Sequence, residues 1–381
     1  LALARKQTAY DSVWGDCDSL YMLDMWQLRH FNLENSRILE GCTSYSLQYK
    51  VAAAETGVKR VLLTASQASG FIVGSTVSVG DKGSNSSVDR YNTWMRDIAD
   101  KVKVKSIETV TVGGTDYSAV NLDVADSFDV PETAYISSMP WHSGATEALP
   151  GHSDGAPGSL TNGKYPCRWA GVEMLNGAYV IGLDPLWNVT TVDGGVTYTA
   201  MACRDSEKEA GSVTANHVKV AEKTFTSVNA WNYELSMQND STESLLPDKT
   251  GGGETVGMKS AFSVYGSAGV RCPWRYGNLN NAGIAGAACA NGNNSPANSN
   301  WNGVPRPTEI LRHSPKLCRI ALCYPCRKLK SCETDTAPGF GRGYALRAHG
   351  GASSRTPRPC TKGHGNRKPL HISKYFYETK I

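Results

Sequence analysis

Trp274-Arg275-Tyr276-Gly277-Asn278-Leu279-Asn280-Asn281-Ala282-Gly283 opens an asparagine-rich run that continues through 291–294 and 298–302 to Arg306. Asparagine is a poor helix and strand former because its amide competes for backbone hydrogen bonds, yet it offers donors and acceptors to an approaching molecule. A solvated low-complexity loop is one interpretation of such a run. The small residues of 283–289 divide the asparagines into two groups, however, and this alternation favours a scaffold that carries a polar display surface.

The length and composition are those of a globular protein. The chain has 381 residues, enough for one large domain or two ordinary ones, and its 40% hydrophobic content is compatible with a buried core. No stretch approaches the roughly 20 apolar residues that a membrane-spanning helix needs, so we expect no membrane insertion. The chain starts at Leu1 without a charged-then-apolar leader, which indicates a fragment or a processed start.

Charge is distributed unevenly along the chain. Residues 307–381 hold fifteen Lys or Arg against four Asp or Glu, a formal +11, so the first 306 residues carry −7 of the +4 total. A basic tail is a candidate for nucleic-acid contact, but its aromatic residues are not regularly interleaved with its charges. We therefore expect no nucleic-acid partner.

The tail from Pro307 to Ile381 differs from the body in composition and lacks periodicity. Its Cys323-Tyr-Pro-Cys326 has the two-residue gap of a zinc knuckle, but no second pair at that spacing follows, so unpaired thiols and no metal are expected. No acidic cluster with calcium-loop spacing is present, and no cofactor is predicted. We predict a disordered tail or one altered by a frame change near Val304, which would remove a closing strand from the preceding domain.

The first part of the chain has helical periodicity. Apolar residues recur at three- and four-residue steps from Leu20 to Leu39, which predicts a helix-rich opening over 10–45. Gly41 is expected to end the helix. From Val58 the period changes to short β-branched runs, which predict a small β-barrel or sandwich over 58–135.

Shorter signals refine this division. Gly113-Gly114 separates two strand-like runs and predicts a hairpin turn, and 91–99 predicts a short helix. The runs 168–173 and 177–183 predict a strand, a turn and a second strand. Between them and the β-rich module, the loop 139–168 pairs His142 with Glu147 and His152 with Asp154, which we interpret as solvent-facing because the spacing matches no ligand motif.

Three segments resemble the variable proteins of diversity-generating retroelements, many of them phage-borne. Residues 31–43 are similar to the family's early helix with an Asn-Ser pair, and 165–173 are similar to its Arg-aromatic-x-Gly-x-Glu strand. Gly177-Ala178-Tyr179 departs from the family's Gly-Asn-aromatic-x-Trp continuation. The third and most specific segment is the asparagine-rich run itself, which resembles the variable region.

The resemblance implies an α+β fold of the C-type-lectin type, of the formylglycine-generating-enzyme subtype. It implies an opening part over 1–57, an inserted β-rich module over 58–135, the remainder over 136–306 with the variable region at 274–306, and the basic tail over 307–381. It also implies that an error-prone reverse transcriptase rewrites adenine-containing codons in the variable region. The positions that match are Tyr276, Asn278, Asn280, Asn281, Asn291, Asn293, Asn294, Asn298, Asn300 and Asn302.

The function expected from this resemblance is binding without catalysis. We expect a hypervariable surface that recognises a protein or glycan receptor on a bacterial surface, displayed on a phage tail or at the cell surface. Homo-oligomers or virion partners would raise the avidity of weak single sites. One alternative is a structural virion or tail-fibre protein without direct receptor binding. Another is a formylglycine-generating-type oxidase, which would use a closely placed pair of reactive cysteines such as Cys272 and Cys289.

Overall fold

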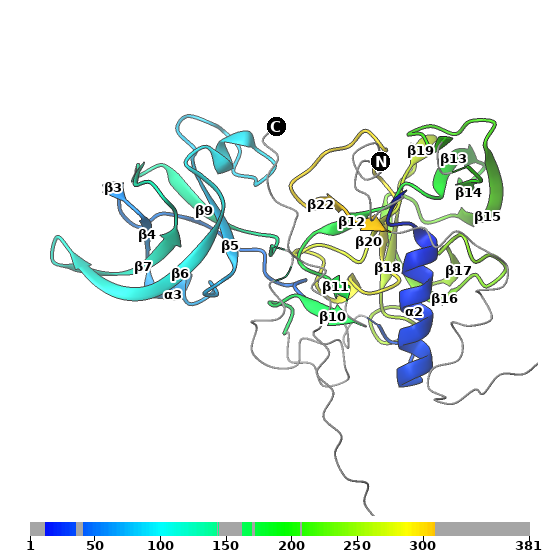
Figure 1. The fold of residues 1–381 in the computed structure, drawn as a ribbon, viewed down its shortest axis with the longest axis horizontal. Coiled ribbons are helices and arrows are strands. Elements are labelled where there is room, and N and C mark those ends of the chain that lie inside the picture. The colour runs from blue at the N-terminus through cyan, green and yellow to red at the C-terminus, as the bar shows by residue number, and fades with distance from the viewer. Residues whose placement is uncertain are drawn as a thin grey trace, which may run out of the picture. The chain divides into compact units, whose positions relative to one another are not determined.

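A computed structural model describes residues 12–35, 41–142, 144, 162–169, 172–205 and 208–308, drawn as ribbons in Figure 1. All of them belong to one compact unit, Leu1–Ile310. Residues 309–381 of the predicted tail 307–381, its cysteine pair and the predicted pair of His152 and Asp154 lie outside the described residues. The described part is rich in β-sheet and has one long helix, so its class is α+β with a strong excess of strand.

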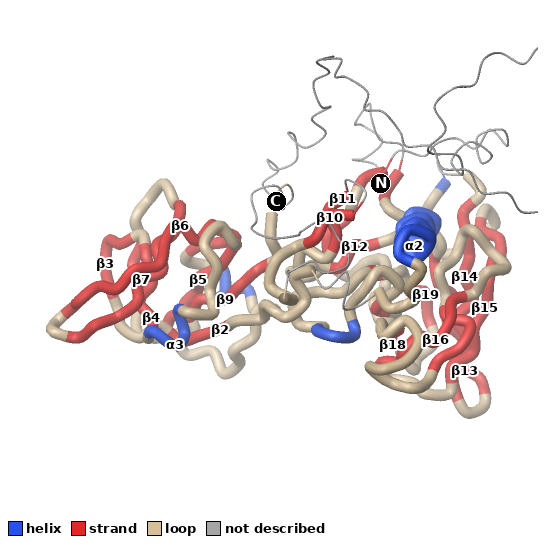
Figure 2. The backbone as a smooth tube through the Cα atoms, turned by 90° about the horizontal axis from the view of Figure 1, so that it is seen from below, coloured by secondary structure: helices blue, strands red, loops and turns tan. Residues whose placement is uncertain are grey.

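Residues 48–139 form an antiparallel sheet of six strands in the order β2-β9-β5-β6-β7-β4, with its own hydrophobic core (Figures 1 and 2). The sheet extends beyond the predicted 58–135 because β2, which begins at Gln48, and β9, which ends at Met139, pair with each other at one edge. A 3-10 turn, η1, replaces the short helix predicted for 91–99. The elements are β2 Gln48–Lys50, β3 Glu55–Val58, β4 Arg60–Leu63, α3 Ala65–Ala68, β5 Thr76–Asp81, η1 Thr93–Arg96, β6 Ala99–Val112, β7 Thr115–Asp123, β8 Phe128–Val130 and β9 Ala134–Met139.

The predicted hairpin turn is confirmed between β6 and β7. Gly113 and Gly114 have φ of +59° and +82°, and Val112 pairs with Thr115 across them. Two consecutive positive φ angles are what a two-residue hairpin turn requires, and glycine adopts them without strain. This turn is therefore specified by two residues alone.

The helix α2, Asp16–His30, is shorter than predicted. It buries Ser19, Met22, Leu23 and Trp26 against the body of the protein. It ends because Phe31 adopts the left-handed conformation, with φ +50°, while its N–H donates to the Gln27 carbonyl. The prediction that the helix continues to Gly41 is wrong, since the described chain from 31 to 35 is a loop.

The remaining strands build a mixed seven-stranded sheet in the order β17-β16-β18-β21-β20-β12-β22 and an antiparallel sheet in the order β15-β14-β13-β19. Figure 2 shows the latter beside α2 and the larger sheet. The first strand predicted for 168–173 is instead a hairpin of two short strands, β10 and β11. The elements are β1 Ser12–Val13, β10 Cys167–Trp169, β11 Val172–Met174, β12 Tyr179–Ile181, β13 Leu186–Val192, β14 Gly195–Cys203, β15 His217–Phe225, β16 Ala230–Met237, β17 Pro247–Thr250, β18 Ala261–Val264, β19 Gly269–Arg271, β20 Trp274–Arg275, η4 Ala282–Ile284, β21 Ala290–Asn291, β22 Gly303–Pro305 and β23 Pro307–Thr308.

The end of the asparagine-rich run is held in the larger sheet. β22 pairs in parallel with β12, with Val304 opposite Val180, and β23 pairs with β1 near the start of the described chain. The body therefore has an edge strand where a missing closing strand was predicted. No helix among the described residues is both long and apolar enough to cross a membrane.

Candidate ligand-binding surface

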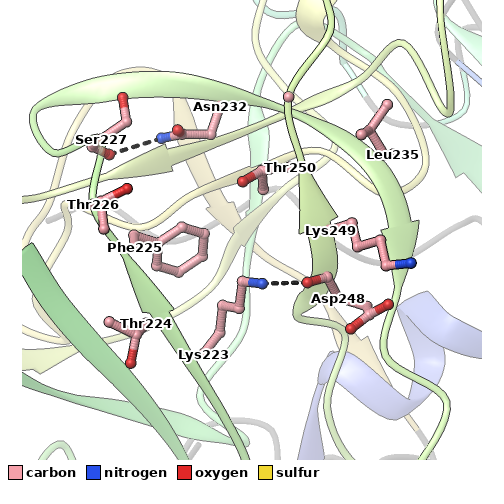
Figure 3. A pocket seen from close by; sticks show the side chains of 11 residues that line it. Lys223, Thr224, Phe225, Thr226, Ser227, Asn232, Leu235, Asp248, Lys249 and Thr250 are labelled. Atoms are coloured by element: carbon pink, nitrogen blue, oxygen red, sulfur yellow. Dashed lines mark hydrogen bonds between the residues drawn. The ribbon is translucent and has the colours of Figure 1, made fainter.

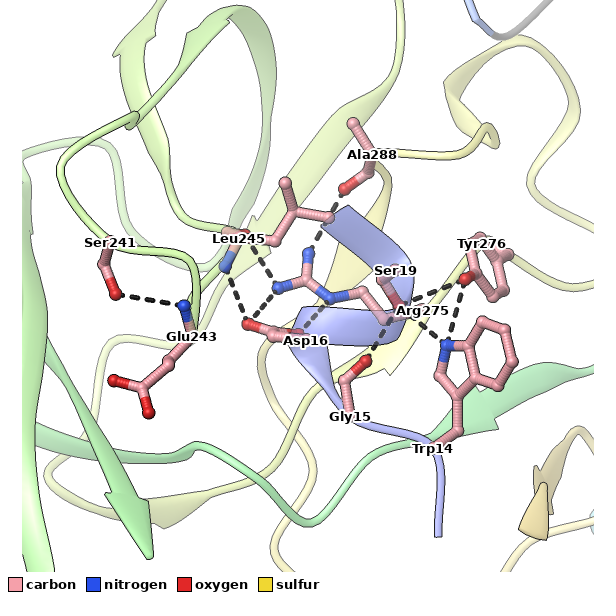
Figure 4. Close-up of polar contacts among 10 residues, drawn as sticks. All are labelled: Trp14, Gly15, Asp16, Ser19, Ser241, Glu243, Leu245, Arg275, Tyr276 and Ala288. Carbon is pink, nitrogen blue, oxygen red and sulfur yellow. Dashed lines mark hydrogen bonds and ion pairs between the residues drawn. The ribbon is translucent and has the colours of Figure 1, made fainter. Parts of the chain in front are cut away.

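The asparagine-rich run leaves the sheet at Arg275, whose side chain is 1% exposed. Its Nε and Nη2 donate to the two carboxylate oxygens of Asp16 over 2.8 and 2.7 Å, and its remaining donors reach the carbonyls of Leu245 and Ala288 (Figure 4). A buried charge is tolerated only when it is paired and fully hydrogen-bonded. The start of the run is therefore fixed to the first turn of α2.

Tyr276 is the first of the ten predicted positions, and its side chain is fully buried. Its hydroxyl donates to Ser19 Oγ over 3.1 Å and accepts from Trp14 Nε1 over 3.0 Å (Figure 4). Burial raises the pKa of this phenol to about 12. Tyr276 thus belongs to the core between α2 and the sheet, and no ligand reaches it in this conformation.

The next three predicted positions form a turn before η4. Asn281 Oδ1 accepts from the Asn278 N–H over 2.6 Å, and Asn278 Oδ1 accepts from the Asn280 N–H over 2.8 Å. Asn278 is 7% exposed, and its side-chain oxygen is used within this turn. Asn280 is exposed and Asn281 is half-buried. The competition of the amide with the backbone, which weakens helices, here specifies the turn.

The second asparagine group is organised in the same way. Asn291 Oδ1 accepts from the Asn293 N–H over 3.1 Å, and Asn298 Nδ2 donates to Asn294 Oδ1 over 3.2 Å. Asn293 and Asn298 are exposed and Asn291 is half-buried, but Asn294 is 9% exposed.

Asn300 and Asn302 flank Trp301 at the end of the run. Asn300 is half-buried, and its Oδ1 accepts from the Trp301 N–H over 2.8 Å. Asn302 is 4% exposed. Of the ten predicted positions, six therefore remain accessible, and we call these the amide cluster: Asn280, Asn281, Asn291, Asn293, Asn298 and Asn300.

Tyr179 links the two asparagine groups. Its hydroxyl is hydrogen-bonded to the side chains of Asn281 and Asn291, and its ring packs on Trp274 with centroids 5.9 Å apart. Burial is the main cause that raises the pKa of Tyr179 above its usual value, so the phenol stays neutral. Two segments on opposite sides of η4 thus meet at one buried residue of β12.

The β-rich module also reaches the run. The Arg90 guanidinium lies over the Trp301 ring at 5.2 Å, and the Tyr91 ring meets the same indole edge-on at 5.9 Å. Arg90 and Tyr91 were not predicted to lie near the asparagine-rich run. No signal in the sequence connects them, because residues far apart along the chain become neighbours only through tertiary packing.

Two cavities lie away from the amide cluster. One, of about 560 Å³, is lined by residues of β15, β16 and β17, and its Lys223 Nζ donates to the Asp248 carbonyl (Figure 3). The other, of about 550 Å³, lies at the end of α2 beside Leu28, Phe31 and Leu33. Neither is lined by any member of the amide cluster.

Cys272 and Cys289, which lie on either side of the first asparagine group, are buried free thiols. Burial raises the pKa of Cys272 to about 12 and that of Cys289 well above its ordinary value. A reactive cysteine needs the opposite shift, towards the thiolate at neutral pH. Burial also lowers the pKa of His142, and Glu147, with which it was paired in sequence, lies outside the described residues. No group of three or more His, Cys, Asp or Glu in the described ranges is placed to hold a metal ion.

No known protein family, curated protein or solved structure gives a significant match to this chain.

Proposed function

We propose that the chain is a ligand-binding protein of the C-type-lectin type, related to the variable proteins of diversity-generating retroelements. In this proposal the amide cluster is the diversifiable surface, and the protein recognises a receptor on a bacterial surface from a phage tail or from a cell surface. The observation that carries the proposal is the division of residues 275–302 into buried and accessible side chains. Buried side chains fix the segment, while six asparagines keep their amides accessible.

The supporting residues favour this division. Arg275 fixes the start of the segment, Tyr179 joins its two halves, and Gly303 follows its end with no room for a side chain. A Cβ at Gly303 would lie 2.7 Å from the Trp274 ring. Substitutions at Asn280 or Asn293, which are exposed, consequently change the surface chemistry without removing a core contact. Substitutions at Asn281 or Asn291 also remove a contact with the buried Tyr179.

The binding is non-covalent and its single-site affinity is low in this sequence. Asparagine is not among the residues that dominate interface energies, which are mainly Trp, Tyr and Arg. Display of several copies would offset this weakness, because linked sites gain on the order of 100-fold or more in avidity.

A library experiment tests the proposal. The six positions of the amide cluster are randomised in the full chain, the library is displayed on yeast, and it is panned against purified lysozyme and streptavidin. Binders whose affinity is lost when the six positions are returned to asparagine support the proposal. A matched control library randomises six exposed positions that are distant in sequence from the cluster, namely Asn85, Thr190, Thr191, Asp193, Asn239 and Asp240. Equal yields from the two libraries would refute it.

The structural-protein alternative is tested with the unmodified sequence. The labelled protein is incubated with intact bacteria of a defined panel, and its retention is compared with that of the Asn280→Ser, Asn293→Ser, Asn298→Ser triple variant. The proposal expects weaker retention for the triple variant. Unchanged retention would favour a structural role for this surface.

A further inference from the structure

Tyr91 stands at the border of the amide cluster on a rigid support. Its side chain is 55% exposed, and its ring rests edge-on against Trp301, which is 7% exposed. The backbone N–H of the same Trp301 donates to Oδ1 of Asn300, a member of the amide cluster, over 2.8 Å. An exposed tyrosine of the module is therefore continuous with the asparagines of the body.

The neighbouring Arg90 holds this border in place. Its guanidinium is 7% exposed and donates to Ser137 Oγ over 2.8 Å, to Ser46 Oγ over 2.6 Å and to the Leu47 carbonyl over 2.7 Å. The same group lies over the Trp301 ring. Arg90 is thus engaged inside the protein and is not available to attract an anion.

Two polar atoms beneath the border have no protein partner. Among the described residues, the Trp301 Nε1 and Asn302 Oδ1 atoms are buried and form no hydrogen bond, while both residues are more than nine-tenths buried. A buried polar group without a partner costs about 1–3 kcal/mol. Both atoms are buried, so they are not part of the accessible surface in this conformation.

We propose that Tyr91 is a constant anchor of the binding surface, and that Tyr91 and the amide cluster together bind an uncharged polar patch on a protein partner. This inference rests on the proposed function and adds a residue outside the variable segment. Tyrosine supplies a large amphipathic contact at a low cost in side-chain entropy, which is why it is frequent in paratopes. The asparagines adjust the hydrogen bonding around it.

The chemistry of the surface favours a protein partner of this kind. Its members carry amides and a phenol but no formal charge, so electrostatic attraction does not select the partner. Asparagine and tyrosine are also enriched in antibody paratopes, which bind proteins.

The test uses two libraries with the amide cluster randomised in the full chain, one with Tyr91 and one with Tyr91→Ala. Both are panned against purified lysozyme and streptavidin, and in parallel against mannan-coated beads. In each selected clone from the Tyr91 library, Tyr91→Ala should weaken binding by at least about tenfold, the effect of an interface hot spot. The affinity should change less than twofold between 50 and 300 mM NaCl.

Tyr21→Ala is the matched control, because Tyr21 is 52% exposed on α2 and should leave every affinity unchanged. Circular dichroism of each variant separates loss of binding from loss of fold. Protein binders that tolerate Tyr91→Ala would overturn the anchor while leaving the proposed function intact. Binders to mannan alone would overturn the partner class, and the absence of any binder would overturn the proposed function itself.

Discussion

Removal of the Asp16 carboxylate should destabilise the protein strongly. Asp16→Ala deletes both oxygens that hold Arg275 and the acceptor for the Leu245 N–H, 3.0 Å away. The guanidinium then remains buried with only the Leu245 and Ala288 carbonyls as acceptors. Loss of one partner of a buried pair costs about 3–5 kcal/mol, because the other charge is left uncompensated.

The assay is urea unfolding at pH 7 followed by tryptophan fluorescence. Arg204→Ala is the control, since its ion pair with Glu243 is exposed and should contribute less than about 1 kcal/mol. The double variant Asp16→Leu, Arg275→Met removes both charges and should recover most of the loss. An Asp16→Ala cost below about 1 kcal/mol, or a double variant no more stable than the single one, would refute the assigned role of this pair.

Four further predictions follow from single sites. Burial raises the pKa of Glu234 to about 7. The unfolded chain therefore ionises this group first, and stability should fall as pH rises from about 4.5 to 7. Glu234→Gln should remove this part of the pH dependence, up to about 3 kcal/mol in the unfolding free energy between pH 4.5 and 8, whereas equal losses in both proteins would contradict it. Gly80→Ala places a Cβ 1.7 Å from the Trp94 carbonyl oxygen and should cost about 3 kcal/mol or more. Gly114→Ala meets open space and should cost only about 1–2 kcal/mol from its positive φ, so similar melting temperatures for the two variants would be inconsistent with this packing. Phe31→Gly should stabilise the protein by about 1 kcal/mol in the same urea assay, because Phe31 is 92% exposed at φ +50°, and any loss of stability would show that its ring is needed. Cys272 and Cys289 should react with a maleimide only in denaturant, since both are buried with raised pKa values, and rapid labelling of the native protein would revive the oxidase alternative.

The structural features that could be predicted from the sequence were those set by local signals. The Gly113-Gly114 hairpin needs only two residues with positive φ, and glycine provides that without tertiary support. The helix end was missed because the apolar spacing continues to Leu39, while the backbone already turns at Phe31. The Asn32 side chain accepts from the Glu34 N–H just after that turn, a local alternative to helix that apolar spacing does not report.

The composition of the candidate surface was only partly accessible to sequence reasoning. Asparagine content marked residues 276–302, but it did not separate Asn280, which is exposed, from Asn302, which is buried. Burial depends on tertiary packing, and Arg90 and Tyr91 of the module pack on the adjacent Trp301. The contribution of the module could therefore be recognised only from the fold.

The hydrogen-bonded turns within the asparagine-rich run bear on the number of sequences this fold tolerates. A replacement at Asn278 or Asn294 must satisfy the Asn280 N–H or the Asn298 amide as well as any partner outside the protein. The accessible Asn281, Asn291 and Asn300 likewise each accept a backbone N–H, whereas Asn280 and Asn293 are exposed. Many random variants across all ten positions would thus fail to fold. The variants that do fold would differ mainly at the six accessible positions, and all of them would keep Tyr91 unchanged.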